Sequence, residues 1–168
     1  NKGSNYYNEI LAEAKKLARD TVDAAASDSS ITRGKNRKLR DSFCGLISEK
    51  GWENFLNYIF GPVASPTNFD EASNQIDIKL KNKKLIEVRS SNVRNGTKFG
   101  LCSAKYNFKN IGPYKNNIKP GEIQKDYYCG VLIPHQKSTI LNIDPVTYHL
   151  VGSSTWEMMM EHEKGYNT

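Results

Sequence analysis

The residues best suited to chemistry are two carboxylates, Asp77 and Glu87, and a guanidinium, Arg89, in a short segment with alternating apolar residues. In a β-hairpin whose turn is centred on Asn82, Asp77 lies directly opposite Glu87, and Arg89 shares their face. Two carboxylates opposed in this way repel each other. A divalent cation would offset the repulsion, because hard cations bind carboxylate oxygens. A surface charge cluster with Arg89 and Lys79 is the alternative.

The apolar residues of the same segment determine the hairpin register. A turn centred on Asn82 pairs Ile78 with Ile86 and Ile76 with Val88, which makes one face wholly apolar. A slip of one residue would move these side chains to the solvent face, so this register is favoured.

The rest of the chain has to position the hairpin. The expected elements, in order, are a helix over 5–26, a helix over 35–60 ended by Gly61-Pro62, a loop over 62–73, hairpin strands over 74–80 and 84–90, a strand over 99–106, a loop over 109–124, a strand over 127–133, strands over 139–143 and 148–151, and a helix over 155–163 capped by Ser153 or Ser154. Inside the second helix, Gly45 and Gly51 indicate close packing or a kink. This order predicts an α/β or α+β domain.

Composition narrows the function classes. The chain has 168 residues, of which 38% are hydrophobic and 25% charged, and this excludes a disordered or low-complexity class. Its net charge of +6 favours a polyanionic partner. Three cysteines without a CxxC motif disfavour a zinc site and a disulfide framework, and they indicate a cytoplasmic setting. No run of 18 apolar residues and no hydrophobic leader are found, so neither a transmembrane helix nor a membrane partner is expected.

The spacing from Asp77 to Glu87-Val88-Arg89 resembles the core of the PD-(D/E)xK nuclease superfamily, in which an Asp ends one strand and Glu-x-Lys lies on the next. Residues 43–56 are similar to the preceding helix of that family, with Glu49 as the matching acidic residue. Residues 125–131 and 151–158 are similar to its following strand and its closing helix. The resemblance implies a restriction-endonuclease-like core over 35–163, with a central mixed β-sheet flanked by helices. It further implies a single nuclease-like domain over 1–168, with an extra N-terminal helix and a basic linker over 5–34.

The resemblance implies that Asp77 and Glu87, joined by Glu49, bind Mg²⁺, for which Mn²⁺ can substitute. Ile76 replaces the family's proline, which is a minor departure. Arg89 replaces its lysine, and this matters more because arginine does not lose its proton. Three interpretations stay open: Arg89 orients water or steadies the phosphate charge, Lys98 or Lys105 takes the lysine's role, or the site is silent.

The function implied is a metal-dependent endonuclease of the type II restriction kind, which hydrolyses phosphodiester bonds in DNA as a homodimer. An RNA-cleaving or junction-resolving nuclease of the same fold and a silent nucleic-acid-binding module are the alternatives. The predicted catalytic residues are Asp77, Glu87, Arg89 and Glu49. The predicted nucleic-acid-binding residues are Arg37, Lys38, Ser90, Ser91, Asn92, Arg94, Lys98 and Lys105.

Overall fold

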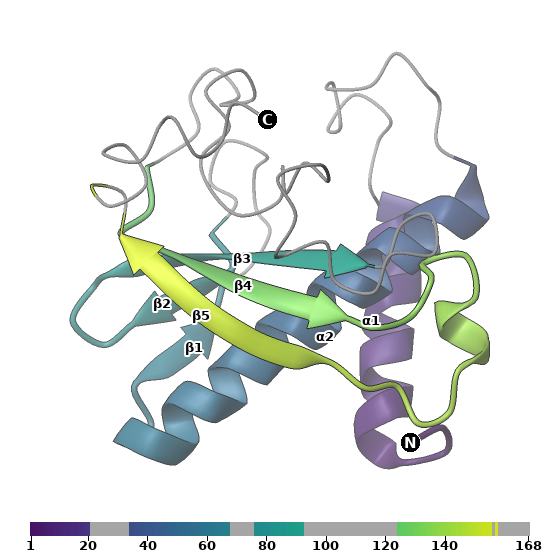
Figure 1. Cartoon of the computed structure of the whole chain (residues 1–168), viewed down its shortest axis with the longest axis horizontal. Coiled ribbons are helices and arrows are strands. Elements are labelled where there is room, and N and C mark those ends of the chain that lie inside the picture. Colours follow the sequence, from purple (N-terminus) through teal and green to yellow (C-terminus); the bar gives the residue numbers. More distant parts are fainter. Residues whose placement is uncertain (21–33, 68–75, 93–123, 156, 158–168) are drawn as a thin grey trace.

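A computed structural model describes residues 1–20, 34–67, 76–92, 124–155 and 157 (Figure 1). The elements are α1 (Asn5–Asp20), α2 (Lys35–Phe60), β1 (Ala64–Pro66), β2 (Ile78–Leu80), β3 (Leu85–Asn92), β4 (Tyr127–Ile133), a 3₁₀ helix (Ile140–Asn142) and β5 (His149–Thr155). In the described part of the chain, two α-helices accompany one mixed five-stranded sheet, so the fold class is α+β. None of the described helices is long and apolar enough to cross a membrane.

The sheet has the strand order β1-β2-β3-β4-β5. Neighbouring strands are antiparallel except β3 and β4, which run parallel. In the hairpin, Ile78 faces Ile86, which confirms the predicted register. A parallel pair needs a crossover connection of a dozen or more residues. Residues 93–126 make this connection. The predicted strand over 99–106 and nearly all of the loop over 109–124 lie there, outside the described residues.

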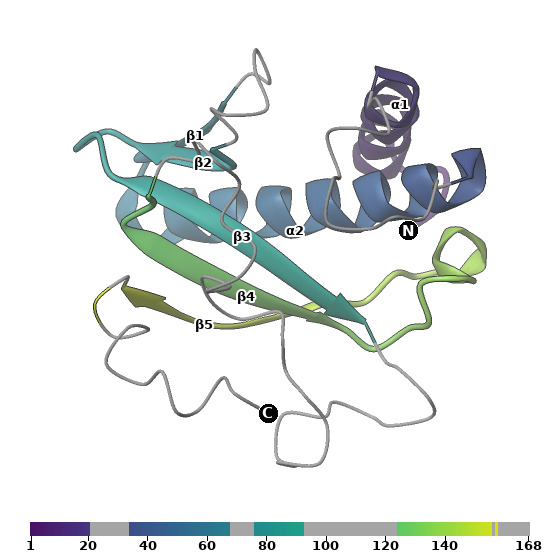
Figure 2. The same ribbon diagram turned by 90° about the horizontal axis from the view of Figure 1, so that it is seen from above.

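Helix α2 covers one face of the sheet (Figure 2). Its bounds confirm the predicted helix, which ends at Phe60 and is followed by Gly61, whose positive φ of 75° is readily adopted by glycine. Trp52 is buried and donates from Nε1 to the Gly130 carbonyl at 3.1 Å, which joins α2 to β4. A Cβ at Gly51 would lie 2.6 Å from Cε2 of Tyr148, so the predicted close packing is confirmed at this position.

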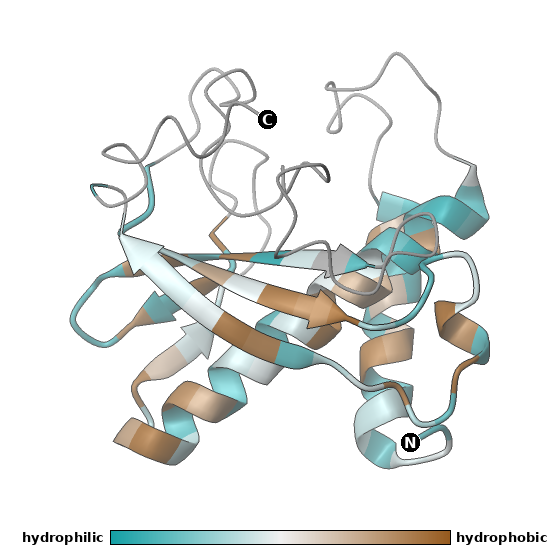
Figure 3. Ribbon diagram, in the orientation of Figure 1, coloured by the Kyte–Doolittle hydropathy of each residue, from teal (hydrophilic) through white to brown (hydrophobic). Residues whose placement is uncertain are grey.

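Helix α1 packs on the side of α2 that faces away from the sheet (Figure 2). Tyr7, Ile10 and Ala14 form its buried stripe, and the Tyr7 ring lies 5.5 Å from that of Phe43. These apolar residues belong to the same core as those of α2 and β4, and Figure 3 shows hydrophobic residues along all three elements. Within the described residues α1 ends at Asp20, and 21–26 of the predicted helix lie outside them.

The predicted loop over 62–73 is wrong at β1, because a three-residue strand is too short to show an alternating pattern. A side chain of α2 holds this edge strand. Asn57 Oδ1 accepts from the Val63 and Ala64 amides at 2.9 and 2.8 Å, and its Nδ2 donates to the Ala64 carbonyl at 3.0 Å. An edge position also tolerates Pro66, which cannot donate to a sheet.

Two predictions near the C-terminus are also wrong. The strand expected over 139–143 is a 3₁₀ helix, since the apolar spacing that suggested a strand also fits one helical turn with Ile140 buried. Ser153 and Ser154 do not cap a helix, because they lie in β5 and pair with Cys129 and Tyr128 of β4. Pairing with a buried strand has overridden the local capping pattern. Most of the predicted helix over 155–163 lies outside the described residues.

Candidate active site

The hairpin opens where the predicted acidic residues lie. Regular pairing of β2 with β3 stops at Ile78 and Ile86, and Asp77 lies just before β2. Asp77 Oδ2 accepts a hydrogen bond from the Val88 amide at 2.6 Å, so a carboxylate takes the place of a backbone acceptor. The next backbone carbonyl toward the N-terminus, that of Ile76, accepts from the Thr67 hydroxyl instead. The observed register is the predicted one, but the ladder ends at Ile78 and Ile86, so Asp77 lies outside it and forms no ladder pair with Glu87.

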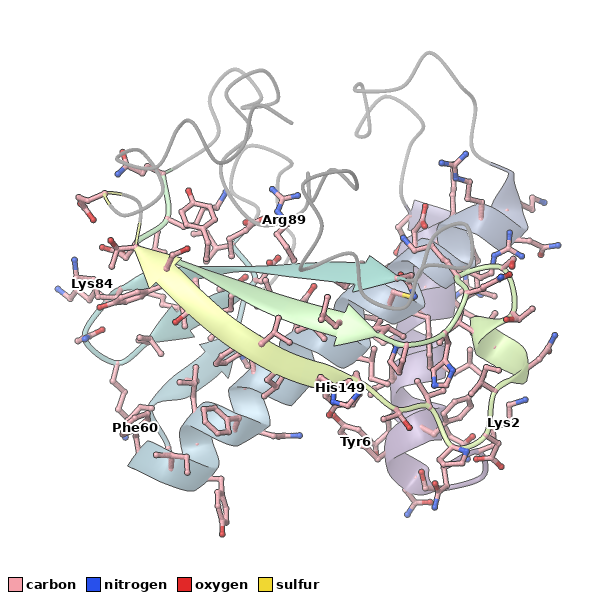
Figure 4. All side chains as sticks on the ribbon, in the orientation of Figure 1. Lys2, Tyr6, Phe60, Lys84, Arg89 and His149 are labelled. Carbon is pink, nitrogen blue, oxygen red and sulfur yellow. The ribbon has the colours of Figure 1, made fainter. Side chains whose placement is uncertain are left out.

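Among the described residues, two cationic side chains bind Glu87. Its side chain is 10% exposed; Oε1 lies 2.8 Å from Nη2 of Arg89, and Oε2 lies 3.4 Å from Nζ of Lys125. The two cations differ in surroundings, since the Arg89 side chain is 37% exposed and that of Lys125 only 2%. Arg89 comes from β3 and rises above the sheet in Figure 4, whereas Lys125 comes from the residues just before β4.

Glu49 joins these residues from α2, and its Oε1 lies 3.6 Å from where a Cβ at Gly45 would stand. Burial, followed by the negative charges of Glu87 and Glu13, raises the pKa of Glu49 to about 7. Burial also raises the pKa of Asp77 well above its ordinary value, and the charges of Glu87 and Glu49 act in the same direction. We call Glu49, Asp77 and Glu87 the carboxylate cluster. They come from three separate parts of the chain and share one electrostatic environment.

The carboxylate cluster fits a hard divalent cation by donor chemistry, since such ions bind carboxylate oxygens. A cation would also relieve the mutual repulsion that raises the pKa of Glu49 and Asp77. Across the described ranges, however, no three acidic, histidine or cysteine side chains are close enough together to hold a metal ion. A cation bound to Glu87 would have to compete with Arg89 and Lys125 for the carboxylate oxygens.

The structure places only some of the predicted nucleic-acid-binding residues. Arg37 and Lys38 lie in the first turn of α2, and Arg37 precedes Glu49 by about 18 Å of helix. Strand β3 contains Ser90, Ser91 and Asn92, and the Asn92 side chain donates to the His135 carbonyl at 3.2 Å, which joins β3 to the segment after β4. The remaining predicted contacts, Arg94, Lys98 and Lys105, lie outside the described residues.

Sequence reasoning missed the role of Lys125. Its signal was a charged Lys-Asp pair directly before the apolar run of β4, and the neighbouring Asp126 fixes its backbone. The Asp126 amide donates to the Leu85 carbonyl at 2.9 Å, and Oδ2 of Asp126 accepts from the Leu85 amide at 2.9 Å. The sequence alone could not show that β4 lies beside β3, so lysines nearer in sequence were considered instead.

The fold and the site together define an α+β protein with a partly buried acidic cluster at the open end of a hairpin. No family model matches the chain, and no solved structure gives a significant match. The chain is similar to an uncharacterized protein of Methanocaldococcus jannaschii, with 36% identity over 142 residues that cover 76% of this chain and 50% of the relative. It thus spans about half the length of the curated relative it matches.

Proposed function

We propose that this chain is a Mg²⁺-dependent endonuclease of the type II restriction kind that hydrolyses phosphodiester bonds in DNA. The observation in support is the carboxylate cluster, in which burial and the neighbouring carboxylates raise the pKa of both Glu49 and Asp77. Strongly perturbed acidic groups beside a specific charged partner are typical of functional sites. The mixed sheet with α2 on one face agrees with the restriction-endonuclease-like core that the PD-(D/E)xK resemblance implies. We propose that the chain has this core and acts as a homodimer.

Each residue of the site has a part in this proposal. Asp77, held by the Val88 amide, and Glu87, held by Arg89 and Lys125, offer hard oxygen donors together with Glu49. When bound to them, Mg²⁺ would polarise the scissile phosphate and lower the pKa of a water molecule. Arg89 is the exposed cation of the pair on Glu87, and its permanent charge suits the negative charge that develops on phosphate. The net charge of +6 attracts the polyanionic substrate.

A second candidate is a silent module that binds nucleic acid without cleaving it. The observation that favours it is the pairing of both Glu87 oxygens with cations of the chain itself. In that case Arg89 and Lys125 neutralise Glu87 permanently, and the basic surface alone provides the function. A silent module would bind nucleic acid with a steep salt dependence and would not respond to divalent ions.

Cleavage assays with an isosteric variant test the proposal. Supercoiled plasmid and single-stranded RNA are incubated with wild type, E87Q and E9Q in Mg²⁺, Mn²⁺ or EDTA, and Glu9, an exposed acidic residue of α1, gives the matched control. We expect discrete DNA fragments from wild type and E9Q with either metal, none in EDTA, and a loss of about a hundredfold or more in E87Q. Thermal unfolding establishes that E87Q is folded.

The other outcomes separate the candidates. Cleavage by E87Q at the wild-type rate would refute the site. Cleavage of RNA alone would replace the DNA substrate with RNA. Metal-independent binding of both nucleic acids without any cleavage would establish the silent module instead.

A further inference from the structure

We propose that Lys125 is a positioning residue, whose buried ammonium group holds the Glu87 carboxylate from the protein interior while Arg89 holds it from the solvent side. Its consequence for catalysis rests on the proposed nuclease function. The role of Glu87 as an acidic site residue was predicted from the hairpin. The new inference is that a residue outside the hairpin determines how Glu87 is oriented.

The Lys125 side chain is buried beside Glu87. A lysine has a long, flexible side chain and ordinarily keeps its ammonium group in water even when its methylene groups pack on apolar surface. Lys125 instead has a side chain that is 2% exposed, and its Nζ lies 3.4 Å from Oε2 of Glu87. A buried ammonium group is strongly unfavourable unless a carboxylate or another acceptor compensates it. The position of Lys125 is therefore imposed by the fold.

Asp126 fixes the backbone next to Lys125. Asp126 joins Leu85 through both its amide and its carboxylate, and its Oδ1 lies 2.5 Å from Nζ of Lys84. These bonds attach the start of β4 to the start of β3, two residues before Glu87. The Lys125 side chain thus enters the site from a defined point of the neighbouring strand.

Lys125 and Arg89 bind different oxygens of the same carboxylate. Arg89 binds Oε1 at 2.8 Å from two residues further along β3, and Lys125 binds Oε2 from the adjacent strand. Rotation of the carboxylate about its terminal bond would lengthen both contacts. Asp77 is held differently, by the Val88 amide. The two cations therefore fix the orientation of Glu87 relative to Asp77 and Glu49.

Replacement of both partners of a buried ion pair by apolar residues is often neutral, whereas removal of one partner destabilises a protein because it leaves the other charge uncompensated. Since Arg89 still pairs with Glu87 when Lys125 is replaced, K125M should remain folded. K125R retains the positive charge and is the matched control.

A double-mutant cycle in EDTA tests the contact without metal or activity. Thermal unfolding is measured for wild type, K125M, E87Q and K125M/E87Q. We expect the decrease in melting temperature of the double variant to be clearly smaller than the sum of the decreases in the two single variants. The reason is that both single variants remove the same contact. Additive losses would overturn the proposal.

Metal binding and cleavage test the positioning role. Calorimetry with Mn²⁺ should show about fivefold tighter binding to K125M, because one positive charge no longer competes for Glu87, while K125R should stay within about twofold of wild type. In Mg²⁺, K125M should cleave plasmid about a hundredfold more slowly than wild type, because the Glu87 carboxylate is no longer held on both sides.

The possible failures are distinguishable. Wild-type cleavage by K125M, or unchanged Mn²⁺ binding, would overturn the positioning role and leave the nuclease function standing. A wild type that neither binds Mn²⁺ nor cleaves would refute the nuclease function, and the cycle in EDTA would then decide alone whether Lys125 holds Glu87.

Discussion

Asp77 and Asp126 lie on opposite sides of β3 and have the same backbone role. Asp77 accepts from the Val88 amide at 2.6 Å, and Asp126 accepts from the Leu85 amide at 2.9 Å. Their pKa values nevertheless move in opposite directions. A hydrogen bond from Lys84 lowers the pKa of Asp126, whereas burial, followed by the charges of two other carboxylates, raises that of Asp77.

The comparison shows what separates a structural acid from a candidate site residue. Acceptance of a backbone hydrogen bond favours the ionised form in both aspartates. Only the surroundings differ, because Asp126 faces a half-exposed lysine and Asp77 lies beside Glu87 and Glu49. A fold that keeps three carboxylates within electrostatic range of one another sacrifices stability at that place, which is expected where function requires it.

The largest expected effect is the difference between D77N and D126N in cleavage. In both variants the asparagine oxygen can still accept the backbone hydrogen bond, so only the charge is removed. D77N should lose plasmid cleavage in Mg²⁺ by about a hundredfold or more, because it removes a donor of the proposed metal site. D126N should stay within about threefold of wild type, because its carboxylate does not belong to the cluster. Initial rates of plasmid nicking measure both.

Equal losses in the two variants would show that both aspartates act through the fold. The comparison would then lose its functional meaning. Urea unfolding of each variant in EDTA distinguishes a folded, inactive protein from a destabilised one.

The second effect is the pH dependence of stability in the metal-free protein. The pKa of Glu49 is about 7 in the folded state, above its ordinary value of 4.5. Between these two values the folded state binds more protons than the unfolded state, so the free energy of unfolding falls as pH rises and is lowest above 7. The fall should be on the order of 2 kcal/mol from about pH 5 to 8, measured by urea unfolding in EDTA.

E49Q should flatten this dependence, because it removes the carboxylate whose ionisation destabilises the folded state. E9Q, which removes an exposed carboxylate of α1, should keep the wild-type slope. If the stability of the wild-type protein rose over the same pH range, this would contradict the raised pKa of Glu49 in the carboxylate cluster.

Patterns local in the sequence predicted those elements around the site whose structure depends on residues close together in the chain. The helix over 35–60 and the pairing of Ile78 with Ile86 follow from apolar periodicity, and both are confirmed. They also bring Glu49 within electrostatic range of Asp77 and Glu87. Where a side chain is positioned by a segment far away in the chain, the sequence gives little indication of that contact.

Long-range pairing accounts for the failures. Lys125 reaches Glu87 only because β4 runs parallel to β3, and no local pattern reveals which strand lies beside which. Strand β1 depends on bonds from Asn57, and Ser153 lies in a strand because it pairs with Cys129. These contacts join residues far apart in sequence, and their free energy outweighs local preferences.

The smallest expected effect is in D126A, which removes the side-chain carboxylate of Asp126, the structural one of the two aspartates compared. The variant leaves the Leu85 amide without its side-chain acceptor, and this should lower the free energy of unfolding by about 1 kcal/mol near pH 7. Because the pKa of Asp126 is lowered in the folded state, its stabilisation is present above its ordinary pKa and is lost as pH falls through the folded value. The difference between D126A and wild type should therefore narrow in acid, opposite to the trend for Glu49.

K84Q distinguishes the contribution of the Lys84 ion pair to stability from that of the hydrogen bond between Asp126 and the Leu85 amide. The Lys84 side chain is half exposed, so the loss of its charge should change the melting temperature by less than about 2 °C, measured by thermal unfolding. A K84Q loss as large as that of D126A would assign the stabilisation to the ion pair rather than to the bond with Leu85. If D126A also slows cleavage more than D126N does, the bond to Leu85 places Lys125 as well as stabilising the sheet, and the structural aspartate then supports the site indirectly.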